Sequence, residues 1–191
     1  MSTREEILGA AQRRLNLDPT SSMADIAAAA GIGRATLHRH FSGREDLLVE
    51  IGTRSLDRWE QRLDAARVGD VCTSEDAARL RETLVTLLGQ YLEDSDDFGF
   101  ALTDQFVLAE PTLTARGEAL AEREIELFAA AQAAGVLRDD VSPRWLSQAC
   151  YGLLVAARDA LRAGDVPRRD LDAVVSSFFL HGAAAPGKPV R

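Results

Sequence analysis

The chain has 191 residues and a formal net charge of −8, and 46% of its residues are hydrophobic. This length suits one compact unit or a small domain attached to a larger one, and no apolar run approaches the roughly 20 residues of a membrane-spanning helix. The charged, amphipathic N-terminus lacks the apolar segment of a signal peptide, so we expect a cytoplasmic protein. Cys72 and Cys150 fit neither a metal site nor a disulfide framework, and we expect both to be buried and reduced.

Helical periodicity, without strand alternation or an internal repeat, predicts an all-α fold of about nine helices. The first helix is expected at residues 3–17, and two short ones lie within residues 22–41. The later helices are expected at 44–67, from Thr73 or Ser74 to the acidic run 93–97, and at 98–109, 111–134, 143–163 and 167–180, with a loop at 68–72. The tail at 182–191 is rich in small residues and contains prolines, and we expect it to be disordered.

The segment 22–41 predicts two short helices joined by a tight turn. Ser22 can cap the first helix, with Asp25 as its capping-box partner three residues later. Leu37 and Phe41 share one face of the second helix, so this face should be buried. Its opposite face offers arginine, imidazole and hydroxyl groups to solvent, which is typical of a DNA-binding helix-turn-helix.

The order and spacing of the residues in this window match a known pattern of pairs and short runs. The matching residues are Ser21-Ser22, Ile26-Ala27, Ala30-Gly31-Ile32-Gly33, Thr36-Leu37-His38, His40-Phe41 and Arg44 with Leu47. They resemble the DNA-binding motif of TetR-family transcriptional regulators. The resemblance implies an N-terminal three-helix helix-turn-helix domain at residues 1–48. A helical domain for ligand binding and dimerisation would follow at 49–181.

Arg34 and Arg39 are the candidates for reading bases, because a guanidinium can bond guanine O6 and N7 together. The alternative is that both are ordinary solvated arginines. Ala35 lies at the centre of the same exposed face. The residues expected to position the duplex through phosphates are Ser22, Thr36, His38, His40 and Arg44. In the family, positions 38 and 44 are tyrosine and lysine.

The acidic total charge does not exclude nucleic acid, because the position of the charges matters. No acidic residue lies between Ile26 and Arg44, whereas acids gather at residues 93–97 and 139–140. This distribution predicts a basic tip on an acidic body.

The family resemblance also implies a pocket within the middle helices. The aromatic and apolar residues that could line it, or simply pack the core, are Trp59, Leu63, Tyr91, Phe98, Phe106 and Phe128. The last two helices carry more apolar surface than a small domain can cover, which predicts pairing with a second copy. The candidate interface residues are Trp145, Tyr151, Leu154, Leu161, Leu171, Val174, Val175 and Phe178.

These features predict a homodimeric, ligand-responsive repressor with two partners, a near-palindromic double-stranded DNA operator and a small-molecule effector. An activator of the same fold is the alternative that the sequence does not separate from a repressor. A helical carrier or enzyme is the third hypothesis, but no catalytic grouping or phosphate-binding glycine loop supports it. His38 and His40 lack a third ligand, so we expect no metal and no cofactor.

Overall fold

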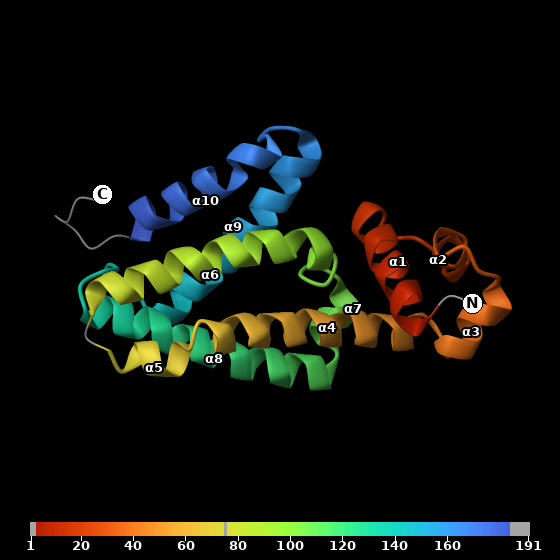
Figure 1. Ribbon diagram of the computed structural model, residues 1–191, viewed down its shortest axis with the longest axis horizontal. Coiled ribbons are helices and arrows are strands. Elements are labelled where there is room, and N and C mark those ends of the chain that lie inside the picture. The colour runs from red at the N-terminus through yellow and green to blue at the C-terminus, as the bar shows by residue number, and fades with distance from the viewer. Residues whose placement is uncertain (1–2, 75, 184–191) are drawn as a thin grey trace. The chain divides into compact units, whose positions relative to one another are not determined.

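The computed structural model describes residues 3–74 and 76–183 of the chain. These residues form ten helices and no strand, which confirms the all-α prediction (Figure 1). The helices are α1 (Arg4–Leu17), α2 (Met23–Ala29), α3 (Arg34–His40), α4 (Arg44–Ala65), α5 (Val68–Cys72), α6 (Ala77–Phe98), α7 (Gln105–Ala109), α8 (Pro111–Ala133), α9 (Pro143–Ala163) and α10 (Arg168–Ala183).

The helices are distributed over two compact units. The first comprises the described part of Met1–Arg58 together with Asp96–Arg116, and the second comprises Trp59–Ser95 with the described part of Gly117–Arg191. The chain therefore passes between the units within α4, α6 and α8. The predicted domain boundary between residues 48 and 49 falls inside α4 and stays a prediction.

The first unit has a continuous apolar core made by α1 to α4, α7 and the start of α8. Its fully buried side chains include Ile7, Leu37, Phe41 and Ile51, so the motif helices share a core with the helices on either side. Burial of such large apolar groups is the main force that fixes these short helices, which would be marginal in isolation.

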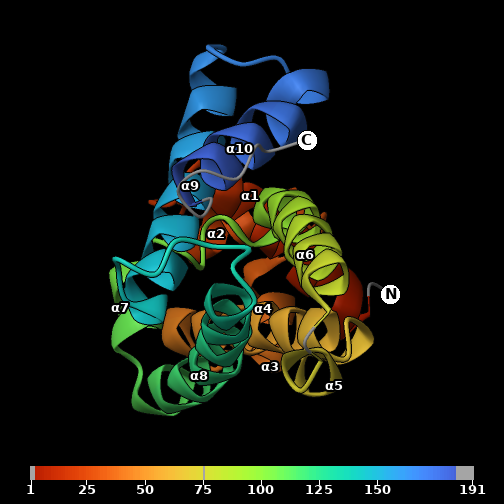
Figure 2. The ribbon, with the colours of Figure 1, turned by 90° about the vertical axis from the view of Figure 1, so that its left-hand side faces the viewer.

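In the second unit, α10 follows α9 after a short connection and packs against it (Figure 2). Gly164 ends α9 with a φ of 78°, a conformation that glycine adopts without strain. The ring of Phe179 on α10 lies 6.1 Å from that of Phe128 on α8, centroid to centroid. This contact fixes α10 to the core of the unit.

Residues 68–77 and the acidic run differ from the prediction. Val68–Cys72 is the short helix α5 rather than a loop, and it accounts for the tenth helix. Helix α6 begins at Ala77, because Asp76 accepts hydrogen bonds from the amides of Ala78 (2.9 Å) and Arg79 (3.2 Å). The acidic run lies inside α6 instead of ending it.

The segment after α6 was expected to be one helix over 98–109, and this is wrong. The chain turns after Phe98, and α7 begins only at Gln105, where Asp104 caps it by accepting from the amides of Phe106 (3.1 Å) and Val107 (3.0 Å). At the C-terminus α10 extends to Ala183, so the tail predicted from residue 182 starts within a helix. The rest of that tail, 184–191, lies outside the described residues.

Candidate functional site

The helix-turn-helix forms as the sequence predicts. The Ser22 hydroxyl accepts from the Asp25 amide (3.3 Å), while the Asp25 carboxylate accepts from the Ser22 amide (2.8 Å) and hydroxyl (2.6 Å). These bonds to Ser22 hold the pKa of Asp25 below its usual value. Gly31 has a φ of 67° in the turn, and α3 begins after Gly33, which supplies no side-chain cap.

The side chains of α3 divide between core and solvent. Leu37 is fully buried, and Phe41, which follows the helix, is buried beside it. The predicted contact residues Arg34, Ala35, His38 and Arg39 are exposed, whereas Thr36 and His40 are half-buried. Arg39 donates from Nη2 to the Thr36 hydroxyl at 2.9 Å. The structure therefore places Arg34, Ala35, His38 and Arg39 on the solvent-exposed side of α3, with Thr36 and His40 partly covered. Ser22, which precedes α2, is also exposed.

Arg44 lies at the first turn of α4 and is occupied by contacts within the chain. Its Nη2 donates to the carbonyl oxygen of Pro19 at 2.8 Å, and its Nη1 donates to the carbonyl oxygen of Ser21. The guanidinium thus ties the start of α4 to the residues just before α2. A guanidinium has five N–H donors, so this tie leaves donors for a phosphate.

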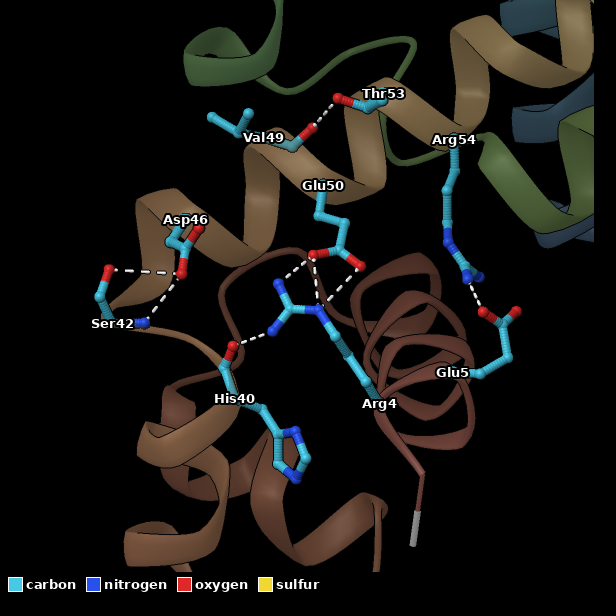
Figure 3. Close-up of polar contacts among 9 residues, drawn as sticks. All are labelled: Arg4, Glu5, His40, Ser42, Asp46, Val49, Glu50, Thr53 and Arg54. Carbon is cyan, nitrogen blue, oxygen red and sulfur yellow. Dashed lines mark hydrogen bonds and ion pairs between the residues drawn. The ribbon is translucent and has the colours of Figure 1, made fainter.

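Sequence reasoning missed Arg4, the first residue of α1. Its guanidinium contacts Glu50 on α4 and the carbonyl oxygen of His40 at the end of α3 (Figure 3). It also lies over the ring of Phe41. No periodicity or motif relates positions 46 residues apart, so only the folded structure reveals this junction. Asn16 is a second such residue, because its amide bonds the backbone of Asp97 (2.6 Å) and Phe100 (2.8 Å).

A small cavity lies in the second unit between α6, α8, α9 and α10. It is lined by Leu84, Leu87, Leu88, Tyr91, Glu124, Leu127, Phe128, Cys150 and Phe179. Its volume of about 10 Å³ has room for about one water molecule. A larger molecule could enter only if these side chains moved apart.

Glu124 is the one acidic side chain buried in the described part of the chain, and it lines this cavity. The Ser147 hydroxyl donates to it at 2.7 Å, and Tyr91 lines the same cavity. Trp59 on α4 in turn donates from its indole nitrogen to the Tyr91 oxygen at 3.1 Å. Burial raises the pKa of Glu124, since removal from water disfavours the charged carboxylate.

The predicted pocket residues fall into different places. Tyr91 and Phe128 line the cavity, Trp59 bonds to Tyr91, and Leu63 is fully buried in the same unit. Phe106 packs against the apolar core of the first unit, and Phe98 also belongs to that unit. Glu124 was missed, although it stands four residues from both Leu120 and Phe128 on the inward stripe of α8. That spacing was the available signal.

The predicted interface residues on α9 and α10 also divide. Trp145 (56% exposed), Tyr151 (37%), Val174 (48%) and Phe178 (70%) face solvent. Leu154, Leu171 and Val175 are buried within the chain, and Leu161 is half-buried. Two neighbouring helices therefore expose four large apolar side chains.

Three further features of the described residues concern metal binding, reactive thiols and membrane-spanning helices. Within 3–74 and 76–183, no three His, Cys, Asp or Glu side chains are grouped so that they could hold a metal ion. Cys150 is buried and Cys72 half-buried, and burial raises the pKa of both thiols. None of the helices formed by these residues has the length and apolar character needed to cross a membrane.

Residues 7–51 match the profile of a family described as bacterial regulatory proteins, tetR family. Over 180 residues the chain is 31% identical to the HTH-type transcriptional repressor LfrR of Mycolicibacterium smegmatis, covering 92% of this chain and 88% of LfrR. It is 26% identical over 178 residues to the HTH-type transcriptional regulator NfxB of Pseudomonas aeruginosa, covering 89% and 88% of the two chains.

Solved structures agree over nearly the whole length. The LfrR structure from Mycobacterium smegmatis in complex with proflavine superposes with a TM-score of 0.72 at 27% identity, covering 94% of each chain. The AibR structure in complex with isovaleryl coenzyme A and operator DNA gives a TM-score of 0.69 at 20% identity, covering 94% of this chain and 96% of AibR. At 20% identity, the comparison with AibR supports a shared fold and nothing more.

Proposed function

Because the chain belongs to the tetR family of bacterial regulatory proteins, which are transcriptional regulators and not enzymes, we propose that it is a ligand-responsive repressor. It binds a near-palindromic operator as a homodimer and releases the DNA when a small-molecule effector binds. The proposal assigns DNA binding to residues 1–48, and effector binding and dimerisation to 49–181. A protein with this role works in the bacterial cytoplasm.

The observation that carries the proposal is the exposed surface of α3. Arg34 and Arg39 are exposed on a short helix whose other face packs into the core through the buried Leu37. A helix of this kind can enter the major groove, where a well-placed arginine discriminates guanine by roughly 1–3 kcal/mol. The absence of acidic residues between Ile26 and Arg44 removes repulsion from the phosphates.

Dimerisation is supported by the exposed apolar side chains of α9 and α10. Four large apolar groups on two adjacent helices form a surface that water disfavours and that a second copy would cover. A two-fold axis through this surface would present two α3 helices to successive major grooves. The operator would then be a near-palindrome.

Repression rather than activation is supported by the name of LfrR, a repressor at 31% identity over most of this chain. Activation is the alternative that remains. The two are separated by measuring transcription from the operator with and without the protein.

We propose that the effector is an organic cation with an apolar body, and that its charge lies near Glu124. The rest of the cavity lining is mostly apolar and carries no positive charge, so the buried carboxylate would be compensated by a positive ligand group. Proflavine, the ligand in the LfrR structure, is a flat aromatic molecule that is positively charged at neutral pH. Because the cavity is almost closed, such a ligand would bind only a rearranged form of the second unit.

The effector signal would pass along α4. Trp59 of α4 bonds to Tyr91, which lines the cavity, and the same helix carries Arg44 and Glu50 at its N-terminal half. An effector that displaces Tyr91 would therefore act on a helix connected to the DNA-binding residues. To release DNA, it must bind the DNA-free arrangement more tightly than the DNA-bound one.

The experiment that tests the proposal is selection from a random double-stranded DNA library, followed by sequencing, at a stated salt concentration. Enrichment of a near-palindromic site supports the proposal and supplies the operator for effector titration. Weak binding without enrichment, lost as salt rises, would contradict sequence-specific regulation and favour a helical carrier.

A further inference from the structure

We propose that Arg4 is a positioning residue for DNA binding, which fixes the end of α3 against α4 through Glu50. This inference rests on the proposed function. The Nε of Arg4 donates to both Glu50 carboxylate oxygens, at 3.3 Å and 3.1 Å, and Nη2 pairs with the same carboxylate. On its other side, Nη1 donates to the carbonyl oxygen of His40 (Figure 3). The guanidinium carbon lies 4.3 Å from the centre of the Phe41 ring.

The contact with His40 is made where α3 needs a partner. His40 is the last residue of α3, and the final carbonyl groups of a helix have no hydrogen-bond donor within it. They also carry the negative end of the helix dipole, which a cation stabilises. Arg4 therefore caps α3 from a different helix and restricts how its exposed face is presented.

The contacts with Glu50 and Phe41 fix the cap itself. A guanidinium is a flat fork that can hold a carboxylate on one edge, donate to a carbonyl on another and lie over an aromatic ring. A lysine ammonium has no such flat edge pair. Glu50 thus orients Arg4, Arg4 orients the end of α3, and neither needs to touch DNA.

For Glu50→Gln, the positioning role and the change of net charge predict opposite effects on operator affinity. Removing a negative charge from a DNA-binding unit ordinarily strengthens binding to the phosphates. If Glu50 instead holds Arg4 in place, Glu50→Gln should weaken operator binding. If Arg4 were itself a phosphate contact restrained by Glu50, the same substitution would free it and strengthen binding.

The structure supplies a matched control between the same two helices. Arg54 of α4 pairs with Glu5 of α1, and this ion pair does not involve α3 (Figure 3). Glu5→Gln removes one negative charge from this α1–α4 pair, as Glu50→Gln does from the other. Comparing the two substitutions separates loss of an ion pair from loss of α3 positioning.

The test measures operator affinity, non-specific DNA affinity and thermal unfolding for wild type, Arg4→Gln, Arg4→Lys, Glu50→Gln, Arg4→Gln with Glu50→Gln, and Glu5→Gln. The operator is the site enriched from the random library. The Arg4–Glu50 pair is partly exposed, so its effect is bounded by the small free energy of such a pair. We expect Glu50→Gln and Arg4→Gln each to lower operator affinity about threefold per DNA-binding domain. For a dimer with both domains on the operator, the loss would be about tenfold.

Three further readouts distinguish positioning from a general structural or phosphate-binding role. The double variant should lose no more affinity than Arg4→Gln alone, because both substitutions break one junction. Non-specific affinity and the salt slope of Glu50→Gln should match those of Glu5→Gln, and Arg4→Lys should not restore operator binding. All comparisons are made at a temperature at which every variant is folded.

Two results would overturn the inference and are distinct from failure of the proposed function. The first result is that the wild-type protein selects an operator and Glu50→Gln binds this operator at least as tightly as Glu5→Gln does. This result refutes the positioning role but not the proposed function. A salt slope lowered by about one phosphate in Arg4→Gln assigns Arg4 a direct phosphate contact instead. Wild-type protein that selects no sequence refutes the proposed function, and the positioning role falls with it.

Discussion

The Ser147 hydroxyl on α9 donates a 2.7 Å hydrogen bond to the Glu124 carboxylate on α8, and Glu124 lines a small cavity that is mostly apolar. Tyr91 on α6 lines the same cavity as Glu124, so residues of three helices surround this acidic group. A buried carboxyl group costs stability when it is charged, and an apolar residue of similar size would pack as well. Its presence at the cavity is the basis for expecting a cationic effector.

Glu124→Gln tests how much the buried carboxylate lowers the free energy of unfolding, and how this effect depends on pH. Burial raises the folded-state pKa of Glu124, so its stability contribution is fully present below the ordinary glutamate pKa and is lost as pH rises through the folded value. We therefore expect the glutamine variant to gain stability relative to wild type as pH rises from about 4 to about 7. Urea unfolding midpoints measured across this range check the prediction. The two groups facing the carboxylate, Tyr91 and Cys150, also have raised pKa values and stay neutral there.

The same variant tests the effector class. With proflavine as a probe of the proposed cationic effector class, Glu124→Gln should bind the dye about tenfold or more weakly than wild type, because a cation would lose its buried partner. Acridine, which has the same ring system and is uncharged at mildly alkaline pH, provides the neutral control and should bind both proteins alike. Fluorescence titration of both dyes measures this. Equal loss of both dyes would attribute the effect to altered packing, and no loss of either would remove Glu124 from the effector site.

We propose a dimer that forms through α9 and α10, and Phe178→Asp should then make the protein monomeric. Phe178 is 70% exposed on α10, and a charge on the surface of α9 and α10 would have to be buried in the interface. Sedimentation equilibrium measures the change. Leu108→Asp, at an exposed apolar position on α7 in the other unit, is the matched control and should stay dimeric. A dimeric Phe178→Asp variant would place the interface elsewhere.

Arg44→Ala should weaken binding to all DNA sequences alike and lower the salt slope by about 0.9. The carbonyl contacts of Arg44 with Pro19 and Ser21 add a second effect, a loss of about 1–2 kcal/mol in unfolding free energy. Binding isotherms at several salt concentrations and urea unfolding separate the two effects. Lost stability with an unchanged salt slope would assign Arg44 a structural role only.

Gly52→Ala tests the close packing of α4 in the first unit. An added Cβ would lie 2.5 Å from Cδ1 of Leu113 and 3.0 Å from Cγ1 of Val107, so these side chains must shift. Overpacking of this kind costs about 1–3 kcal/mol, which urea unfolding can measure. Gly69→Ala in α5 is the control, because nothing lies within 4 Å of its added Cβ. There alanine should stabilise the protein by about 0.5–1 kcal/mol.

Local chemistry explains which parts of the fold could be predicted. The capping box of Ser22 and Asp25, the turn at Gly31, and the end of α9 at Gly164 depend on neighbours in sequence, so the pattern was sufficient. The acidic run at 93–97 was expected to be a loop that ends the helix. It remains helical, and Asp94 pairs with Arg62 of α4 at 2.9 Å, a tertiary contact that periodicity does not contain.

The candidate sites show the same division. The exposed face of α3 followed from the burial of Leu37 and Phe41, so its solvent-facing residues could be named in advance. Arg4 and Glu50 meet only after α1 and α4 have packed, and nothing in either local sequence marks the pair. Glu124 sits on an apolar stripe, where a charged residue is normally assigned to the solvent side.

The measurement that tests the central claim most directly compares the base preferences of wild type and Arg39→Ala over a library of operator variants at one salt concentration. If α3 reads bases, the alanine variant should lose preference at one base pair of each half-site, by about 1–3 kcal/mol, and keep the others. A uniform loss of affinity at every position would contradict base reading by Arg39 and leave it a phosphate contact.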